Sequence, residues 1–567
     1  MLKEGTSYEE VYRSLVWAVP EFFNMGVEVC DRHAEAEPAR TALIFENEGG
    51  DVTQYSFQVL RHLSNKLANL FEAKGLERGD RVGILLPQSV ETGIAHIAAW
   101  KSGIISIPMF TLFGPDALKF RLSDSGARAI ITDTYNLGKI EAIRDQLPEL
   151  KYIFVCGAVQ DGEGLMDLWR GLDRAKDTYT PVRTRADDPS FISYTSGTTG
   201  NPKGALHAHR TLLGHLPGVE MPHEFFPQPG DLMWTPADWA WIGGLMNSLM
   251  TSWYHGVPAL AHRARKFDPE EALRLMARHQ VRNTFMPPTA LKLMRQVENP
   301  AGRFGVKLRT VACAGEPMGA ELLEWGVDAL GVKFNEFYGQ TECNLVTSNC
   351  GRIMEIKPGS MGRAVPGHQV DIIDADGNVL EAEEEGLIAV KSPDPVMFLK
   401  YWNNPKATED KFLDDWLLTG DRGTRDVDGY FWFLGREDDV ITSAGYRIGP
   451  GEIEDCLGRH PAVSLAAAIG IPDPLRTEKI KAFIQLRPGF QASEDLEREI
   501  REFVNRRLSP HEKPRIIDFV DTLPMTATGK IKRKELRDDE TAKSPSSARN
   551  CAMMRSLNPR WDGKRFY

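Results

Sequence analysis

The sequence contains no apolar run long enough to cross a membrane, since none approaches the ~18 consecutive apolar residues of a transmembrane helix. Near the N-terminus, Glu4, Glu9 and Glu10 add negative charge, and Pro20 interrupts the apolar run at residues 15–23. This pattern fits neither a secretory signal nor an Arg-rich transit peptide. We therefore expect a protein without a membrane span, located in the cytoplasm.

The chain also has few cysteines, and fewer positive than negative charges. The seven cysteines among 567 residues are odd in number and scattered, and no CxxC pair occurs. This spacing argues against a disulfide framework or a zinc site and favours reduced thiols. The net charge of −11 argues against nucleic acid as the main partner, which would call for a basic face. Any polyanionic ligand must therefore meet locally concentrated Lys and Arg side chains.

Two periodicities alternate along the chain up to about residue 430, as in α/β domains. Apolar residues at helical spacing are Val59, Leu60, Leu63, Leu67, Leu70 and Phe71. Short apolar runs typical of buried strands are Arg81–Leu86, Ala127–Thr132 and Tyr152–Cys156. We predict a large α/β domain at residues 1–434, with mostly parallel, buried strands.

The composition changes near residues 429–436, where turn residues and charges become dense. Beyond this junction we expect a helix at 452–457, strands at 465–471 and 481–486, and an amphipathic helix from Ser493. The apolar face of that helix is Leu496, Ile500, Phe503, Val504 and Leu508. These elements predict a small α+β domain at 435–537, followed by a polar, Ser-rich and flexible tail at 538–567.

The segment YTSGTTGNPKG, residues 194–204, has four Ser/Thr hydroxyls, three glycines and a lysine, and follows an apolar strand that we expect to end at Ile192. Glycines let the backbone approach a ligand closely, and successive N–H groups in such a turn bind anions. The spacing is not that of a Walker A loop. An ordinary surface turn is the alternative, but it does not explain the PKG ending. We therefore predict a phosphate-binding loop.

Further motifs follow in a fixed order. They are AGEP (314–317), EFYGQTE (336–342), LLTGD (417–421), GREDD (435–439), GYRIGPGEIE (445–454) and ATGKIKR (527–533). Together with the loop, they resemble the adenylate-forming superfamily, which comprises acyl-CoA synthetases, non-ribosomal-peptide adenylation domains and luciferases. The resemblance covers about residues 20–537. It implies a large N-terminal domain of layered sheets and helices and a small, mobile C-terminal domain.

The resemblance also implies roles for individual residues. The β- and γ-phosphates of ATP would be held by Thr195, Ser196, Gly197, Thr198, Thr199, Gly200 and Lys203. Mg²⁺ would be held by Glu342 with help from Thr195, which suits an ion that takes few protein ligands. The residues framing adenine would be Gly315, Glu316, Pro317, Glu336, Phe337, Tyr338, Gly339, Gln340 and Thr341. Asp421 would bind the ribose, and Arg436 and Arg447 would add positive charge.

The principal catalytic residue of adenylation would be Lys530 in ATGKIKR. Its basic neighbours Lys532, Arg533 and Lys534 are interpreted as surface charges. Because Lys530 and the phosphate loop lie in different domains, the domains must close to form the adenylate. By the same resemblance, Asp438 matches a hinge position. Ala444 and Gly445 would then line the passage for coenzyme A.

The segment MWTPADWAWIGGLMN, residues 233–247, offers Trp239 and Trp241 as candidate lining residues of an acyl or coenzyme A pocket. Filling of a core is the equally weighted alternative. Acetate-specific relatives have a Trp where this chain has Gly339, so we expect a cavity for an acid larger than acetate. The chain looks most similar to the medium-chain acyl-CoA synthetase group.

The predicted function is ATP-dependent activation of a carboxylic acid to an acyl-adenylate, followed by thioester formation with coenzyme A. One alternative is loading of the acyl or aminoacyl group onto a separate carrier protein. Another is a catalytically inactive ATP-binding regulator, against which the intact Lys530, Glu342 and Asp421 argue. The sequence leaves open the acid and whether the chain forms a homo-oligomer.

Overall fold

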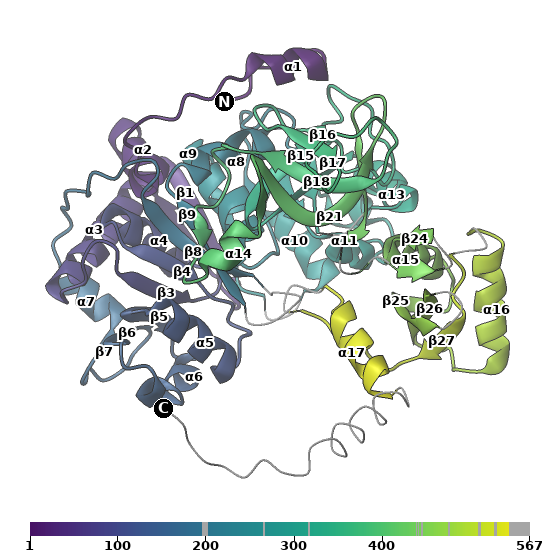
Figure 1. The fold of residues 1–567 in the computed structure, drawn as a ribbon. Coiled ribbons are helices and arrows are strands. Elements are labelled where there is room, and N and C mark those ends of the chain that lie inside the picture. Colours follow the sequence, from purple (N-terminus) through teal and green to yellow (C-terminus); the bar gives the residue numbers. More distant parts are fainter. Residues whose placement is uncertain are drawn as a thin grey trace, which may run out of the picture. The chain divides into compact units, whose positions relative to one another are not determined.

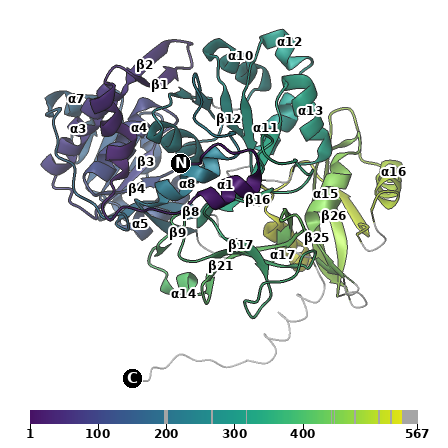
Figure 2. The same cartoon turned by 90° about the horizontal axis from the view of Figure 1, so that it is seen from above.

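In a computed structural model, the described residues of the chain are 1–195, 202–264, 267–315, 318–437, 439, 441–443, 446–473, 477–508, 512–526 and 530–543. The chain forms two compact units (Figures 1 and 2). The large unit comprises Met1–Thr419 and Gly423–Phe433, and the small unit comprises Gly420–Arg422 and Leu434–Tyr567. The large unit is α/β and the small unit is α+β, so the predicted fold class is confirmed.

The first large sheet contains the two strands on either side of the glycine-rich loop, β8 and β9. Its strands, in spatial order, are β19 (Lys400–Tyr401), β9 (Lys203–Ala208), β8 (Pro189–Thr195), β4 (Ile105–Pro108), β3 (Arg81–Leu85), β5 (Ala129–Asp133), β6 (Tyr152–Cys156) and β7 (Leu165–Asp167). Neighbouring strands from β8 to β7 run parallel. β9 is antiparallel to β8, and β19 is antiparallel to β9. The predicted strands correspond to β3, β5 and β6.

Helices cover both faces of this sheet because its strands are apolar on both sides. The helices are α3 (Phe57–Ala73), α4 (Val90–Lys101), α5 (Pro115–Ser125) and α6 (Leu137–Glu141). In β6, Phe154 packs with residues of α3 and α4, whereas Ile153 and Val155 pack with residues of α5 and α6. Helix α3 begins after Ser56, whose hydroxyl caps it. Val59, expected on its buried face, is exposed.

The second large sheet includes the hairpin that contains the EFYGQTE motif. Its strands, in spatial order, are β16 (Arg363–Ala364), β15 (Cys343–Ser348), β14 (Phe334–Gln340), β13 (Thr310–Cys313), β12 (Asn283–Met286), β10 (Met233–Trp234), β11 (Ala259–His262), β1 (Thr41–Glu46) and β2 (Val52–Ser56). From β1 to β14 the strands run parallel, and β15 turns back antiparallel to β14. This hairpin places residues 341–342 at a turn.

Other helices of the large unit surround the two sheets (Figure 2). They are α1 (Tyr8–Ser14), α2 (Arg32–Ala36), α7 (Leu168–Arg174), α8 (Thr211–Glu220), α9 (Thr251–Tyr254), α10 (Pro269–His279), α11 (Pro288–Met294), α12 (Pro300–Phe304), α13 (Ala320–Leu330) and α14 (Pro405–Glu409). A π-helix, η3, spans Gly243–Met250. Among the described residues, no helix is both long enough and apolar enough to cross a membrane.

A third sheet follows near the end of the large unit. Its strands are β17 (Val370–Ile373), β18 (Gly386–Lys391), β21 (Trp416–Arg425), β20 (Phe412–Leu413) and β22 (Phe431–Arg436), of which β22 pairs with β21. The chain passes from one unit to the other within β21 and β22. The LLTGD and GREDD motifs therefore lie where the two units join along the chain.

The small unit contains one mixed sheet with helices on its faces. Its strands, in spatial order, are β24 (Tyr446–Ile448), β23 (Ile441–Ser443), β26 (Thr477–Leu486) and β25 (Val463–Asp473), with β27 (Ile516–Phe519) paired to β26. Its helices are α15 (Pro450–Gly458), α16 (Glu494–Asn505) and α17 (Arg533–Lys543). The apolar face predicted for α16 packs against the sheet, with Leu496, Ile500 and Val504 buried.

The segment at 538–567, which we predicted to be a flexible tail, begins within a helix. Helix α17 continues through Lys543, so residues 538–543 are helical. A salt bridge explains part of this order, because Glu540 lies 2.7 Å from the ammonium group of the buried Lys481. The rest of the segment, 544–567, lies outside the described residues.

Candidate active site

The glycine-rich loop connects two antiparallel strands. β8 runs to Thr195, three residues beyond the predicted strand end at Ile192, and β9 begins at Lys203. Thr195 and Lys203 lie opposite each other in the sheet, and the Thr195 hydroxyl donates to the Lys203 carbonyl at 3.3 Å. The candidate phosphate-binding residues 196–200 lie outside the described residues. The hairpin therefore holds the two ends of the loop together.

Glu342 and Lys203 both contact Tyr401, a residue that we did not predict. The Glu342 side chain is 6% exposed, and its Oε1 accepts a hydrogen bond from the Tyr401 hydroxyl. The Lys203 ammonium lies 5.2 Å from the centroid of the Tyr401 ring. In addition, the backbone amide of Phe398 donates to the Glu342 carbonyl at 2.9 Å. Thr195, Lys203, Tyr401 and Glu342 form one group, which we call the carboxylate cluster.

The other residues of β14 divide between structural and exposed positions. The Glu336 carboxylate is buried and accepts a hydrogen bond from the Met318 amide at 3.1 Å. The Phe337 ring is buried and lies 5.4 Å from the Phe285 ring. Tyr338 is half-buried, which leaves part of its ring accessible to a ligand. Glu316 and Pro317 lie outside the described residues.

The amide of Gln340 is oriented by two neighbours. Its Nε2 donates to the Thr419 carbonyl at 2.9 Å, and its Oε1 accepts from Lys411 at 2.7 Å. The same lysine donates to the Thr419 carbonyl at 3.2 Å. Thr341 follows at the turn and is half-buried. Gln340 therefore fixes the end of β14 beside the carboxylate cluster rather than projecting freely.

Gly339 does not face open space, which differs from our expectation that its missing side chain enlarges the acyl cavity. A Cβ atom at this position would lie 2.3 Å from the backbone nitrogen of Leu345 and 3.0 Å from the carbonyl oxygen of Cys343. Leu345 is fully buried and has a φ of 65°. Glycine is required here because the two strands of the hairpin approach each other closely.

Replacing Gly339 by alanine is therefore expected to lower the free energy of unfolding by about 1–3 kcal/mol, the usual cost of overpacking. Chemical denaturation measures this change. As a control, Gly138→Ala in α6 should be neutral or stabilising, because nothing lies within 4 Å of the added Cβ atom. Unchanged stability of the Gly339 variant would restore the interpretation of an open cavity wall.

The two candidate tryptophans occupy different environments. Trp239 is 1% exposed and packs in the main core of the large unit, as its structural alternative predicts. Trp241 is half-buried, and its ring lies 5.6 Å from the Phe285 ring. A Cβ atom at Gly315 would lie 4.0 Å from the Trp241 ring, so this ring borders the residues expected to frame adenine. Of the pair, Trp241 is the better candidate for contact with a ligand.

Asp238, three residues before Trp241, is a titratable group that sequence reasoning missed. Burial raises the pKa of its carboxyl to about 6, although the Ala240 amide donates to the carboxylate at 2.8 Å. Its backbone carbonyl also accepts from the Trp241 amide at 3.0 Å. The residue therefore shapes the tight turn that orients Trp241. No local sequence pattern indicates this burial.

Two predicted nucleotide-binding residues meet in the small unit. Arg436 lies 3.0 Å from the Asp421 carboxylate, which is 4% exposed, and the Glu437 amide donates to the Gly420 carbonyl at 2.9 Å. The pairing of β21 with β22 thus brings the LLTGD and GREDD motifs together. Arg447 lies in β24 with its side chain outside the described part of the chain. The predicted hinge and coenzyme A residues, Asp438, Ala444 and Gly445, also lie outside it.

Lys530 has an exposed side chain on a backbone that is fixed at both ends. Its amide donates to the Thr526 hydroxyl at 3.0 Å, and the Thr526 amide donates to the Lys530 carbonyl at 2.7 Å. Next to this pair, Met525 and Ile531 form a β-bridge. An exposed lysine side chain is suited to meet an anionic ligand.

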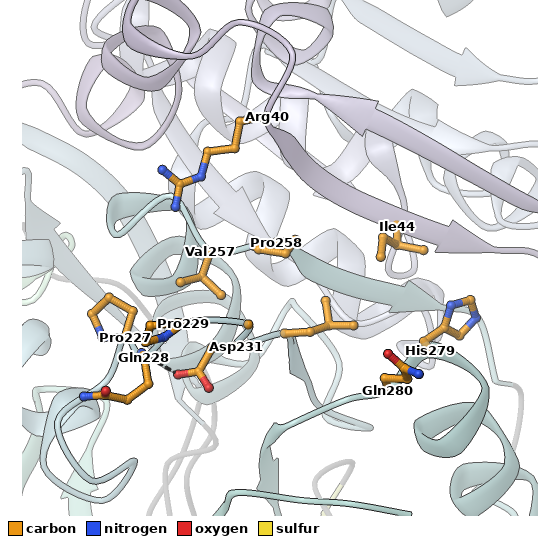
Figure 3. A pocket seen from close by; sticks show the side chains of 12 residues that line it. Arg40, Ile44, Pro227, Gln228, Pro229, Asp231, Val257, Pro258, His279 and Gln280 are labelled. Carbon is orange, nitrogen blue, oxygen red and sulfur yellow. Dashed lines mark hydrogen bonds between the residues drawn. The ribbon is translucent and has the colours of Figure 1, made fainter.

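A separate cavity of about 530 Å³ in the large unit contains none of the predicted site residues (Figure 3). Its lining residues are Arg40, Ile44, Pro227, Gln228, Pro229, Gly230, Asp231, Leu232, Val257, Pro258, His279 and Gln280. Asp231 accepts from the Gln228 amide at 2.8 Å and pairs with Arg309 at 2.7 Å. Its carboxylate therefore stabilises the loop around the cavity.

Comparison with known proteins relates these motifs to a family. A sequence profile of the AMP-binding enzyme family matches residues 30–402, and a profile of the AMP-binding enzyme C-terminal domain matches residues 452–530. Human "Acyl-coenzyme A synthetase ACSM3, mitochondrial" is 34% identical, covering 94% of this chain and 92% of that protein. "Acetyl-coenzyme A synthetase" from Bacillus subtilis is also 34% identical, covering 94% of each chain.

Solved structures agree with this relationship. The anthranilate CoA ligase AuaEII, in complex with anthranoyl-AMP, has a TM-score of 0.85 and 30% identity, covering 93% of this chain and 98% of that chain. The acyl-CoA synthetase from Brucella canis has a TM-score of 0.73 and 32% identity, covering 95% and 99%. The chain therefore belongs to the family of AMP-binding enzymes and is an enzyme of the acyl-coenzyme A synthetase type.

Proposed function

We propose that this chain activates a medium-chain or similar carboxylic acid with ATP and Mg²⁺, and transfers the acyl group to coenzyme A. In the first half-reaction a carboxylate oxygen attacks the α-phosphate of ATP, and pyrophosphate leaves. In the second, the thiolate of coenzyme A attacks the carbonyl carbon, and AMP leaves. Both partners of the first step are anions, so the protein contributes mainly positioning and positive charge.

The carboxylate cluster is the observation that supports this proposal most strongly. It places a cation, Lys203, and a hydroxyl, Thr195, at the two ends of the glycine-rich loop, within the same group as the buried Glu342. A triphosphate held over the loop would meet Lys203 as a point charge. Mg²⁺ bound to that triphosphate would meet the Glu342 carboxylate.

The cluster also fits the chemistry of a magnesium site. Among the described residues, no group of three or more His, Cys, Asp and Glu side chains is placed to hold a metal ion. Mg²⁺ does not require such a group, since one carboxylate, phosphate oxygens and waters complete its octahedron. Glu342 would supply the carboxylate and Thr195 a hydroxyl oxygen. The neutralising charge would make the α-phosphate easier to attack.

The Tyr401 hydroxyl orients the proposed metal ligand, Glu342, so Tyr401→Phe is expected to raise the Mg²⁺ concentration for half-maximal pyrophosphate release by about 10–100-fold, the usual cost of losing a hydrogen bond to a metal ligand. The substitution removes only the hydroxyl that donates to Glu342. Titration of Mg²⁺ at saturating ATP measures the shift. Tyr430→Phe is the control, because its hydroxyl donates to the distant Glu355 carbonyl instead. Equal Mg²⁺ dependence of both variants would exclude an orienting role for Tyr401.

The remaining roles follow the family resemblance. We propose that Tyr338 stacks on adenine, that Asp421 and Arg436 bind the ribose and phosphates, and that Lys530 stabilises charge at the α-phosphate. Asp438 would be the hinge between domains at 1–434 and 435–537. The cytoplasmic location remains a proposal as well, since several relatives are named mitochondrial.

The identity of the acid rests on less. Relatives and neighbours are named for acetyl, anthranilate and benzoate substrates as well as for acyl groups in general. The contacts of Gly339 do not support the cavity argument drawn from the sequence. The half-buried Trp241 beside Gly315 is the described residue that best fits a wall of the acyl site.

Pyrophosphate release across a panel of carboxylic acids tests the proposal. With ATP, Mg²⁺ and a matching acid, pyrophosphate should form, and an acyl-CoA product should appear by mass spectrometry when coenzyme A is added. Adenylate without thioester would indicate carrier-protein loading. Absence of pyrophosphate with short, medium, long and aromatic acids would contradict acid activation and favour a regulator.

A further inference from the structure

Arg533 lies three residues after Lys530 and is bound to two carboxylates of the small unit. Its Nε and one terminal nitrogen lie 2.9 and 2.5 Å from the two oxygens of Glu454. Its other terminal nitrogen lies 3.4 Å from Asp439, which also pairs with Arg537 at 2.7 Å. The two-point contact with Glu454 is the planar arrangement that makes arginine–carboxylate pairs strong and directional.

This ion-pair group is largely shielded from water. The side chains of Arg533, Glu454 and Asp439 are 21%, 13% and 10% exposed. By contrast, Lys532 is 47% exposed, and its ion pair is with the exposed Glu535, one helical turn along at 3.2 Å. The expectation that all basic neighbours of Lys530 are surface charges is therefore wrong for Arg533. A shielded pair restricts its backbone far more than an exposed pair does.

Glu454 is itself anchored to the centre of the small unit. It lies in α15, and its Oε1 accepts a hydrogen bond from the Ala468 amide of β25 at 2.8 Å. Arg533 begins α17, which follows directly on the segment that contains Lys530. The guanidinium therefore connects that segment to both a helix and the sheet.

The described residues just before Arg533 make further contacts besides the Thr526–Lys530 hydrogen bonds and the Met525–Ile531 bridge. Ile531 packs against a small apolar cluster that also contains Leu523 and Leu536, and the Lys532 amide donates to the Pro524 carbonyl at 2.9 Å. These contacts hold the segment against the sheet. The backbone contacts join residues 524–526 to 530–532 within the segment, and apolar packing is not directional. The Arg533 pair with Glu454 adds a directional link from this segment to α15.

We propose that Arg533 is a positioning residue that holds the Lys530 segment in register on the small unit through Glu454. Asp439 directly follows the proposed hinge residue, so the same guanidinium also links this segment to the start of the small unit. The inference rests on the proposed function, since Lys530 must act on ATP for its position to matter. Arg533, which the sequence pattern alone presents as a surface charge, would thus have a role in catalysis through Lys530.

Arg533→Met tests the proposal, because it keeps the apolar stem and removes the charge. Adenylation should fall by up to about 100-fold, the loss expected from a misplacement of about 1 Å. Thioester formation from supplied acyl-adenylate should change by less than about 3-fold, since it does not use Lys530 at the α-phosphate. Equal losses in both half-reactions would overturn the positioning role.

Two controls separate positioning from loss of stability. Lys481→Met removes the ion pairs of the buried Lys481 with Glu540 of α17 and with Asp518 of β27, and should destabilise the unit without slowing adenylation. The double variant Arg533→Met/Glu454→Gln removes the unpaired buried charge, so its melting temperature should recover toward that of the parent protein. Adenylation should stay low in this double variant. Recovery of both together would show a merely structural role and overturn the proposal.

Hydrogen exchange followed by mass spectrometry gives a readout that does not need activity. Peptides covering 520–536 should exchange faster in Arg533→Met and not in Lys481→Met, because the amides of Thr526 and Lys530 pair within this segment. Unchanged exchange would refute the positioning role directly. If exchange is faster in Arg533→Met but the parent protein releases pyrophosphate with none of the acids tested, the proposed function is refuted. The structural role of Arg533 is then retained.

Discussion

Replacing Lys530 by alanine is expected to lower the rate of acyl-adenylate formation by about three decades. An ammonium group about 4 Å from the α-phosphate contributes on the order of 4 kcal/mol at an effective dielectric of about 20. Expressed in the transition state alone, this energy corresponds to about a thousandfold in rate. Because the side chain is exposed, the melting temperature should change little. Single-turnover pyrophosphate release measures the effect.

The second half-reaction provides the internal control for this variant. Thioester formation from supplied acyl-adenylate and coenzyme A should proceed at nearly the parent rate, because no negative charge develops at the α-phosphate of incoming ATP. Lys532→Ala is the matched variant, since its exposed side chain pairs with the exposed Glu535. Equal loss of both half-reactions in Lys530→Ala would contradict the separation of roles between two states of the small unit.

Replacing Glu342 by glutamine is expected to slow adenylation by at least about 100-fold, because losing a direct metal ligand should cost no less than losing a residue that orients one. Glutamine keeps the volume of the side chain and its oxygen for Tyr401, but it removes the negative charge offered to Mg²⁺. The pyrophosphate-release assay, repeated over a range of Mg²⁺ concentrations, should show weaker Mg²⁺ binding: the rate should keep rising with Mg²⁺ and reach no plateau.

A direct measurement of metal binding complements the rate. Mn²⁺ added with ATP should enhance water-proton relaxation with the parent protein and much less with Glu342→Gln, because the bound ion loses its protein ligand. Glu355→Gln is the control, since the backbone carbonyl of Glu355, not its carboxylate, contacts Tyr430. Unaltered rate and relaxation in Glu342→Gln would remove Glu342 from the metal site.

The elements of the fold could be predicted because their signals are local. Strands buried on both faces appear as apolar runs, as in β6, and a helix with one buried face shows a period near four, as in α16. The glycine-rich segment could also be recognised, since its residue types lie within eleven consecutive positions. Its role in binding phosphate stays a prediction. Errors occurred at boundaries, such as the end of β8 and the continuation of α17.

The site could be predicted only where a motif marks it. The hydrogen bond from Tyr401 to Glu342 joins residues 59 positions apart, and β19 reaches its partner β9 across about two hundred residues, so no local pattern predicts either contact. The role of Gly339 depends on a backbone nitrogen 2.3 Å from its absent Cβ atom, which composition does not reveal. Arg533 differs from its neighbours through burial alone.

The central claim is that an acyl-adenylate forms, and the fate of one oxygen atom tests it most directly. In the proposed reaction, a carboxylate oxygen bonds to the α-phosphorus; when the thiolate attacks the carbonyl carbon, the bond from carbon to that oxygen breaks. An acid labelled with ¹⁸O in its carboxylate should therefore yield AMP that contains one labelled oxygen, with unlabelled pyrophosphate. Labelled orthophosphate formed together with ADP, or AMP without label, would contradict the account.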